Sequence, residues 1–215
     1  KTWLFTGFPW LFVGYAFTEQ YWLSSLAPVA GVFAVSFVAV LLAASLVELL
    51  RRRGGYMIPT AALLIVSCAL WLLNPQWTKP KGTPDLSVSL IQGNIPQDLK
   101  WLTKYQVETL KIYATLSSTE WGSDMILWPE SSIPMFQDEA LGFISEVVKV
   151  AKETDTTWVT GIPYKDTAAF DAKTDKYPPF YNSVIALGAD AEGLYKKQRL
   201  VPFGEYIPFE GMLDI

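Results

Sequence analysis

Two long apolar runs stand out in the first third of the chain. Residues 26–47 contain no charged side chain over 22 positions, which corresponds to about 33 Å of helix at ~1.5 Å per residue. Residues 56–73 form a second, shorter run of 18 positions, about 27 Å, with Pro59 near its start, where a helix tolerates proline. Because neither run has a polar face, we predict membrane-spanning helices at 26–49 and 56–73 rather than a buried helical pair in a soluble protein.

The segments that flank these runs complete a membrane region at residues 1–84. Residues 1–25 are rich in Trp, Phe and Tyr but are broken by glycine and proline, which favours an interfacial aromatic segment over a further crossing. Three arginines at 51–53 form a basic loop typical of the cytoplasmic side. Residues 74–84, with three prolines and no periodicity, predict a linker. The remainder of the chain is therefore expected outside the cytoplasm.

Residues 85–215 alternate between strand and helix patterns, which predicts a mixed α/β sheet with helices packed on it. The expected strands are 86–90, 125–128, 157–162, 182–187 and 194–198, with a turn at 188–193 between the last two. The expected helices are 103–118, opening on a threonine cap, and 138–153, with one apolar stripe. The predicted fold class is a membrane α-helical hairpin joined to an α/β domain.

Charge and composition separate the same two regions. Residues 1–84 carry six basic and two acidic side chains, whereas residues 85–215 carry 11 and 19, so the overall charge of −4 describes neither region. The acidic region lacks a basic stripe, and we expect no nucleic-acid partner. The chain has no histidine and one cysteine. A Ser-His-Asp triad and a histidine-bearing zinc site are thereby excluded within it, and no metal or cofactor motif is evident.

Three polar positions are candidates for chemistry. Glu130 follows a buried strand and a proline, at the strand end where α/β sheets bind ligands, and we expect it to be partly desolvated and to act as a general base. Lys196 and Lys197 should point to opposite faces of a strand, so that one of them reaches the site. Glu205 lies in a proline- and glycine-rich loop. The structural alternatives are a Glu130 that caps a turn, a solvated Lys197 and a Glu205 used only in turn formation.

Three motifs occur together in the chain: WPES at 128–131, YKKQRLVPFGEY at 195–206 and IQGNIPQ at 91–97, which leads into Lys100 and Trp101. With these motifs the chain resembles the bacterial apolipoprotein N-acyltransferases, a branch of the nitrilase (carbon-nitrogen hydrolase) superfamily. TGFPWL at 6–11, LAPVAGV at 26–32 and YNS at 181–183 extend this resemblance along the chain. WPE alone is a weak signal, but its combination with the VPFGEY loop behind a membrane hairpin is specific.

The resemblance implies a nitrilase-like αββα sandwich, incomplete in this chain, on the periplasmic side of a multi-pass bacterial inner-membrane protein. It implies a Glu-Lys-Cys triad with Glu130 as general base and Lys197 stabilising the tetrahedral intermediate. Glu205 would be an additional glutamate beside the triad, and Trp101 would bind substrate near a lipid-facing mouth. The implied reaction moves an acyl chain from a phospholipid, through a cysteine thioester, to the amino terminus of a diacylated apolipoprotein. No cofactor is implied, and we expect a monomer in the lipid bilayer.

The chain differs from the family pattern in its nucleophile, because no residue of the chain matches the family's catalytic cysteine. Cys68, the one cysteine, lies within the second apolar run, where a thiol is a small buried apolar group. We therefore expect the nucleophile beyond Ile215 and earlier membrane helices before Lys1, which would make this chain a fragment that is inactive alone. Two alternatives stay open for the whole protein: a membrane-tethered amidase that uses water as acceptor, and a catalytically inactive membrane-anchored binding module.

Overall fold

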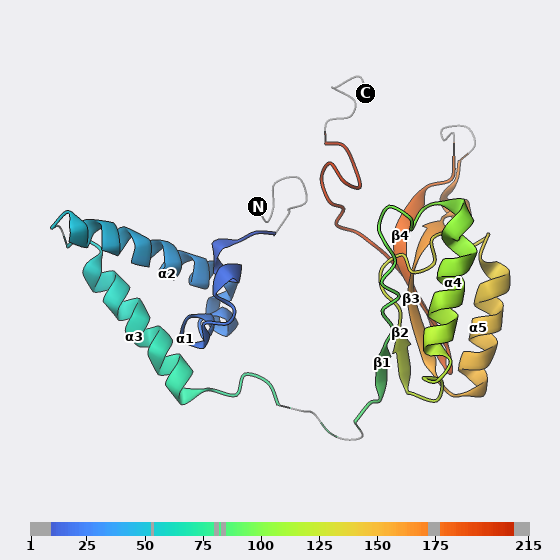
Figure 1. The fold of residues 1–215 in the computed structure, drawn as a ribbon, viewed down its shortest axis with the longest axis horizontal. Coiled ribbons are helices and arrows are strands. Elements are labelled where there is room, and N and C mark those ends of the chain that lie inside the picture. Colours follow the sequence, from blue (N-terminus) through green and yellow to red (C-terminus); the bar gives the residue numbers. More distant parts are fainter. Residues whose placement is uncertain (1–9, 53, 80–81, 83–84, 172–176, 209–215) are drawn as a thin grey trace. The chain divides into compact units, whose positions relative to one another are not determined.

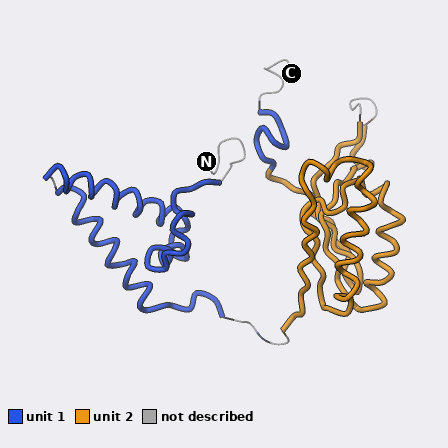
Figure 2. The backbone as a smooth tube through the Cα atoms, viewed as in Figure 1, with its two compact units in different colours: residues 1–82, 200–215 blue, residues 83–199 orange. Residues whose placement is uncertain are grey.

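The computed structural model describes residues 10–52, 54–79, 82, 85–171 and 177–208. The chain divides into two compact units, one of residues 1–82 with 200–215 and one of residues 83–199 (Figure 2). The expected division into a membrane region at 1–84 and a periplasmic domain at 85–215 stays a prediction. The last strand of the sheet ends at Lys196, and beyond it the Gly204 and Glu205 N–H groups donate to the Val201 carbonyl.

The first unit is helical. It contains η2 (Val13–Phe17), α1 (Tyr21–Ser24), α2 (Ala27–Leu50) and α3 (Met57–Leu73), of which the α-helices are labelled in Figure 1. Among the described residues, α2 is the one helix long and apolar enough to cross a membrane, and α3 falls short at 17 residues. The helical path of α2 breaks at Ala30 and Gly31, where Gly31 takes a φ of +68°. The sequence pattern predicted both helices to within one residue but not this break.

The aromatic segment before α2 packs on the helices as short turns. The Gly14 N–H donates to Ser36 Oγ of α2 at 2.8 Å, and a Cβ on Gly14 would lie 2.5 Å from the Val32 carbonyl oxygen. Glycine is therefore required for this close approach. A small apolar cluster holds η2, α1, α2 and α3 together, and its buried members are Leu23, Leu26, Val35 and Val38.

Hydroxyl groups tie the helices of the first unit at two levels. Ser45 of α2 and Thr60 of α3 lie 2.6 Å apart through their side-chain oxygens. Ser25 donates to the Ser67 carbonyl of α3 at 2.9 Å. Hydrogen bonds between apolar helices favour one pairing, because each unpaired hydroxyl would otherwise lie in an apolar surrounding. These contacts account for the polar residues inside otherwise apolar runs.

The second unit contains one five-stranded sheet. Its strands follow chain order: β1 (Val88–Leu90), β2 (Met125–Leu127), β3 (Thr157–Lys165), β4 (Phe180–Gly188) and β5 (Ala191–Lys196). β1, β2 and β3 are parallel, and the β3–β4 and β4–β5 pairs are antiparallel. The carboxyl ends of β1, β2, β3 and β5 therefore meet the start of β4 at one edge of the sheet, with η3 (Thr167–Ala169) between β3 and β4. The predicted mixed sheet is confirmed.

Helices α4 (Thr103–Ser117) and α5 (Leu141–Glu153) lie side by side on one face of this sheet (Figure 1). The core between helices and sheet is aromatic: Trp128 stacks on Tyr113 and meets Trp158 edge to face, each at 5.0 Å between ring centroids. Trp128 Nε1 donates to the buried Ser117 Oγ at 2.9 Å. The other fully buried members of the core are Ile126, Ile133, Ala151 and Ile162.

Both helices begin differently from the sequence prediction. Thr103 is the first helical residue of α4 rather than its cap; Leu102 takes the cap position and makes no side-chain capping bond. α5 begins at Leu141, three residues later than predicted. Asp138 and Glu139 are used outside the helix, since both carboxylates pair with the ammonium of Lys165.

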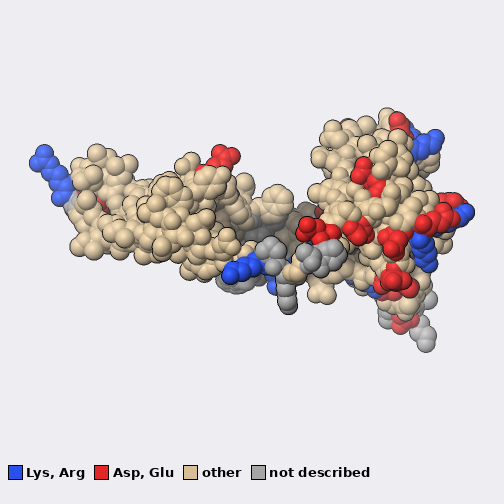
Figure 3. All heavy atoms as spheres, turned by 90° about the horizontal axis from the view of Figure 1, so that it is seen from below, with Lys and Arg blue, Asp and Glu red and all other residues tan. Residues whose placement is uncertain are grey.

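Charge and apolar surface are unevenly distributed. On the face drawn in Figure 3, the second unit carries most of the charged side chains. Arg51 and Arg52, which follow the end of α2, are exposed. No described helix covers the second face of the sheet. Val88 and Leu90 of β1, with Val184 and Tyr195 of β4 and β5, are exposed there.

Candidate active site

Glu130 lies in the loop that leaves β2, directly against β3. The Gly161 N–H donates to the Pro129 carbonyl and the Ile133 N–H to the Gly161 carbonyl, both at 3.3 Å. A Cβ on Gly161 would lie 2.5 Å from Ser131 N and 2.6 Å from Glu130 Cα. Only a residue without a side chain lets the loop approach β3 this closely. Gly161 thus fixes where the backbone of Glu130 runs.

Lys197 comes from the end of β5 and reaches Glu130. Its Nζ lies 3.5 Å from Glu130 Oε1, which is longer than the ~2.8 Å of a tight charge-assisted bond. Lys196 points elsewhere: its ammonium group bonds Asp166 and lies 4.9 Å from the ring centre of Tyr181. The hydrogen bond from Lys196 lowers the pKa of Asp166, and Asp166 in turn raises the pKa of Lys196. The two lysines therefore point apart, and Lys197 is the one that faces the site.

Two further residues hold Glu130. The side-chain amide of Asn182, at the start of β4, donates to Glu130 Oε1, while the Asn182 backbone carbonyl accepts the Lys197 N–H at 2.8 Å. Lys100, in the loop between β1 and α4, donates from Nζ to the Glu130 backbone carbonyl at 2.9 Å. Burial lowers the pKa of Lys100, and attraction to the Glu130 carboxylate opposes that shift. Glu130 is thus held through its side chain and its backbone.

The expected desolvation of Glu130 is not found, since its side chain is 65% exposed, against 29% for Lys197. Glu130 lies past the end of β2, and its carboxylate is contacted by polar groups of Asn182 in β4 and Lys197 directly after β5. Glu130 and Lys197 open onto a cavity of about 500 Å³. Its lining also includes Gly161, Asn182, Tyr195 and Arg199.

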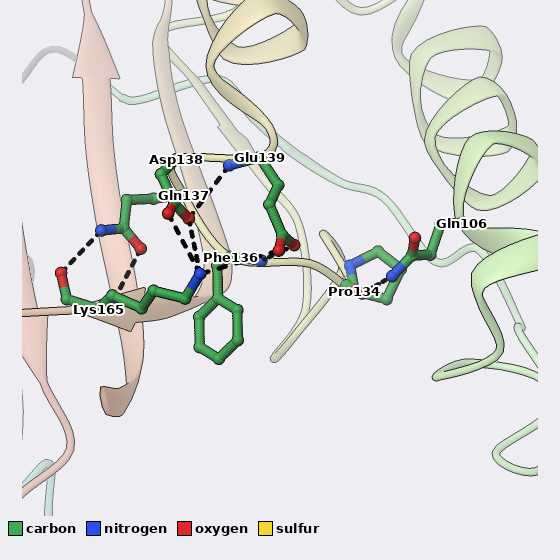
Figure 4. Close-up of polar contacts among 7 residues, drawn as sticks. All are labelled: Gln106, Pro134, Phe136, Gln137, Asp138, Glu139 and Lys165. Atoms are coloured by element: carbon green, nitrogen blue, oxygen red, sulfur yellow. Dashed lines mark hydrogen bonds and ion pairs between the residues drawn. The ribbon is translucent and has the colours of Figure 1, made fainter. Parts of the chain in front are cut away.

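The far end of the Glu130 loop is fastened to β3 and α4 (Figure 4). Gln137 exchanges two hydrogen bonds with the Lys165 backbone, at 2.7 and 2.8 Å, and Gln106 of α4 donates to the Pro134 carbonyl at 2.8 Å. The Lys165 ammonium pairs with Asp138 at 3.1 Å and lies 4.2 Å from the ring centre of Phe136. With both ends held, the loop has little freedom to move Glu130.

Trp101 and Glu205 are the other two residues expected at the site. Trp101 is 52% exposed beside Lys100 and, among the described residues, is not part of the cavity lining. Glu205 belongs to the first compact unit, where its Oε2 accepts the Val201 N–H at 2.7 Å. The expected placement of Glu205 beside Glu130, like the substrate-binding role of Trp101, stays a prediction.

Sequence reasoning assigned no role to Lys100 or Asn182. Asn182 was visible only as part of the YNS match, and Lys100 as the neighbour of Trp101. A sequence pattern could have drawn attention to both as polar residues at strand ends, because Asn182 begins a strand and Lys100 lies between a strand and a helix. Their convergence on Glu130 depends on the strand order, which a single sequence does not reveal.

Comparison with known proteins identifies the fold. The model of the carbon-nitrogen hydrolase family matches residues 87–213, and that of the apolipoprotein N-acyltransferase N-terminal domain matches residues 1–45. The chain belongs to the carbon-nitrogen hydrolase family. This family membership confirms the nitrilase-like fold, of which the described residues contain one sheet and one helix layer.

Within the carbon-nitrogen hydrolases, the chain is similar to apolipoprotein N-acyltransferases. It is 37% identical over 216 residues to that of Methylococcus capsulatus and 40% identical over 217 residues to that of Pseudomonas aeruginosa strain PAO1. Each match covers 99% of this chain and 41% of the relative, so the chain spans well under half the length of these relatives. A solved N-terminal amidase aligns at TM-score 0.36 and 17% identity over 54% of this chain and 28% of its own, a likeness too weak to build on.

The arrangement in this carbon-nitrogen hydrolase unit suits proton transfer and oxyanion stabilisation. A carboxylate, held by an amide, lies beside an ammonium group at the edge of an open cavity. A carboxylate can accept a proton from a nucleophile, and a fixed cation can stabilise negative charge that develops on a carbonyl oxygen. The described part of the chain contains no cluster of three metal-binding side chains.

Proposed function

We propose that the whole protein to which this chain belongs is an apolipoprotein N-acyltransferase that moves an acyl chain from a phospholipid to the amino terminus of a diacylated lipoprotein. The observation that carries the proposal is the approach of Lys197 Nζ to Glu130 Oε1 at 3.5 Å, in a carbon-nitrogen hydrolase fold. The 37–40% identity to enzymes of that name over nearly the whole chain supports the choice of substrates.

In the first step, Glu130 accepts the proton of a cysteine thiol supplied by another part of the whole protein. The sulfur attacks the ester carbonyl of the phospholipid, and the ammonium of Lys197 stabilises the oxyanion that forms. The carbon–oxygen bond then breaks, and the departing lysophospholipid oxygen takes the proton back from Glu130. The acyl chain is left on the cysteine as a thioester.

In the second step, the α-amino group of the diacylglyceryl cysteine attacks the thioester. Glu130 accepts the proton that this nitrogen loses, Lys197 again stabilises the oxyanion, and the carbon–sulfur bond breaks. The proton returns to the sulfur, which regenerates the thiol and leaves an amide on the lipoprotein. Cys68 does not fit the role of nucleophile, since it lies inside α3. In this proposal Glu205 lies beside the triad, and Trp101 contacts lipid at the mouth of the site.

Anchoring in the membrane suits this chemistry because both substrates are lipids. We infer that α2 and α3 belong to a multi-pass anchor in the bacterial inner membrane, with exposed Arg51 and Arg52 on the cytoplasmic side. The second unit then faces the periplasm. Since the two apolar helices are joined by a short basic turn, the chain enters and leaves this hairpin on the same side.

The test uses the full-length protein, a phospholipid of defined acyl chains and a diacylated lipopeptide. Glu130→Gln should reduce N-acylation by about 10²–10⁴-fold, because it removes the proton acceptor without changing the shape of the side chain. Lys197→Met should reduce it by about 10²–10³-fold. Glu146→Gln and Lys149→Met, on the exposed side of α5, are the matched controls and should keep normal rates.

Three results would contradict the proposal. Normal transfer by either site variant would overturn the roles assigned to Glu130 and Lys197. Release of ammonia from a small amide in the absence of lipid would identify an amidase instead. A wild-type protein that binds lipopeptide but never forms an acyl-enzyme would be an inactive binding module.

A further inference from the structure

Among the described residues that line the cavity, Arg199 is the charged one for which the structure shows no hydrogen-bond or ion-pair partner. The described lining of the cavity contains three charged side chains, those of Glu130, Lys197 and Arg199. Glu130 and Lys197 approach each other, and Glu130 also accepts a hydrogen bond from Asn182. Arg199 is exposed and, within the described residues, makes no hydrogen bond or ion pair. One carboxylate against two cations leaves the cavity with a net positive charge.

We propose that Arg199 binds the phosphate of the phospholipid acyl donor, an inference that rests on the function proposed above. A guanidinium group offers paired N–H donors that match two oxygens of a phosphate, and it stays charged at all relevant pH values. A phosphodiester carries one negative charge, which balances the excess positive charge of the cavity. The acceptor lipopeptide has no phosphate, so Arg199 acts in the first step alone.

The spacing of the two cations fits one donor molecule. Arg199 follows Lys197 by two residues, so their Cα atoms are at most about 7 Å apart. In a glycerophospholipid, the glycerol backbone alone separates the ester carbonyl from the phosphate. Lys197 at the carbonyl and Arg199 at the phosphate can therefore engage the same lipid. A cavity of about 500 Å³ admits the glycerol and its phosphate while the acyl chains extend elsewhere.

The experiment measures the two steps separately in the full-length protein. Formation of the acyl-enzyme is followed with phosphatidylglycerol in detergent micelles, and transfer to a diacylated lipopeptide is followed after loading at saturating donor. Arg199→Gln should raise the KM for phosphatidylglycerol by about 10- to 100-fold, the effect of losing a charge-assisted phosphate contact, with kcat nearly unchanged. Arg199→Lys should recover part of this loss. Lys149→Gln, outside the cavity, is the control and should match the wild type.

Salt provides a readout that a purely structural role would not change. Because the contact is between charges at an exposed site, the wild-type KM for phosphatidylglycerol should rise with ionic strength, and that of Arg199→Gln should rise much less. Transfer from the loaded enzyme to the lipopeptide should proceed at the same rate in both proteins.

The possible failures are distinguishable. A wild-type protein that forms no acyl-enzyme from phosphatidylglycerol would overturn the proposed function and this inference with it. A wild type that loads normally, beside an Arg199→Gln variant whose KM is within twofold of it, would overturn only the role of Arg199. Equal losses in both steps would also overturn it, since they would indicate a structural effect.

Discussion

Gly161→Ala tests whether the position of Glu130 depends on the close contact between its loop and β3. The added Cβ would lie 2.5 Å from Ser131 N, 2.6 Å from Glu130 Cα and 2.7 Å from the Pro129 carbonyl oxygen. Non-bonded atoms pack at roughly 3.5 Å or more. The loop must therefore retreat from β3 by about 1 Å, and because all three contacts are with backbone atoms, a side-chain rotation cannot relieve them.

A displacement of about 1 Å at a group that exchanges protons costs about 100-fold in rate, which corresponds to ~2.7 kcal/mol of transition-state stabilisation. We expect kcat/KM for N-acylation by Gly161→Ala to fall by about that factor. Overpacking of this kind also destabilises a protein by about 1–3 kcal/mol, so the thermal unfolding midpoint should fall while the protein still folds. The assay is transfer from phospholipid to diacylated lipopeptide by the full-length protein, with unfolding followed in the same detergent.

Gly142→Ala is the matched control. Gly142 lies in α5, and a Cβ there would meet nothing within 4 Å. Alanine is favoured over glycine inside a helix by about 1 kcal/mol, so this variant should be at least as stable as the wild type and fully active. Wild-type activity in Gly161→Ala, within threefold, would refute the claim that this contact positions Glu130.

Three further predictions follow from contacts in the second unit. Asn182→Ala should lower kcat for N-acylation by about 10- to 100-fold, because the Glu130 carboxylate loses the hydrogen bond that the Asn182 amide donates; an unchanged kcat would contradict this. Because folding lowers the pKa of Asp166, this carboxylate stabilises the fold above its unfolded pKa of about 4, and the stabilisation is lost as the pH falls through the folded pKa. Because folding raises the pKa of Lys196, this ammonium group stabilises the fold below its unfolded pKa of about 10.4, and the stabilisation is lost as the pH rises through the folded pKa. The unfolding midpoint of Asp166→Asn should therefore lie below that of the wild type at neutral pH and converge with it in acid, and a gap that persists in acid would exclude this linkage. Ile126→Ala, at a fully buried core position, should destabilise the protein by about 2–5 kcal/mol in denaturant unfolding, whereas a change below 1 kcal/mol would mean that the core can collapse around the missing side chain.

The order of elements in the second unit could be predicted from sequence because each has a local signal. β2 is a short apolar run stopped by Pro129, and α5 has a single apolar stripe, so both were found. The sequence predictions were wrong at the ends of helices and strands. α5 begins late because the Lys165 ammonium, supplied by β3, pairs with Asp138 and Glu139. A local pattern does not contain the partner that lies 26 or 27 residues away.

The candidate site was also predictable only where it depends on local sequence signals. Glu130 could be found because a strand end followed by proline and a carboxylate is a local feature. Packing between segments that are distant in the sequence decides the rest: the high exposure of the Glu130 side chain, its hydrogen bond from Asn182 and the bond from Lys100 to its backbone carbonyl. The break in α2 at Gly31 is of the same kind, since the sequence there is continuous and apolar.

Which of two adjacent lysines reaches Glu130 is decided by the hairpin that joins β4 and β5. The sequence predicted a turn at 188–193 and a strand at 194–198, whereas the strands continue to Gly188 and from Ala191, leaving two residues in the turn. Gly188 makes this tight turn possible, because its φ is +95° and a Cβ would lie 2.6 Å from the Thr156 carbonyl oxygen. The resulting register pairs Ser183 with Lys196 and brings Lys197 opposite Asn182.

A shift of this register by one residue would exchange the faces of the two lysines. Lys196 would then point toward Glu130, and Lys197 would turn toward Asp166, so the site would keep a cation in a different position. The tight turn at Gly188, at the opposite end of the hairpin, therefore determines which of the two lysines faces Glu130. Asn182 reinforces the same register, since its backbone holds Lys197 while its side chain holds Glu130. The pairing of β4 with β5 therefore sets the relative position of the Glu130 carboxylate and the Lys197 ammonium group, and the attraction between these two side chains does not set it.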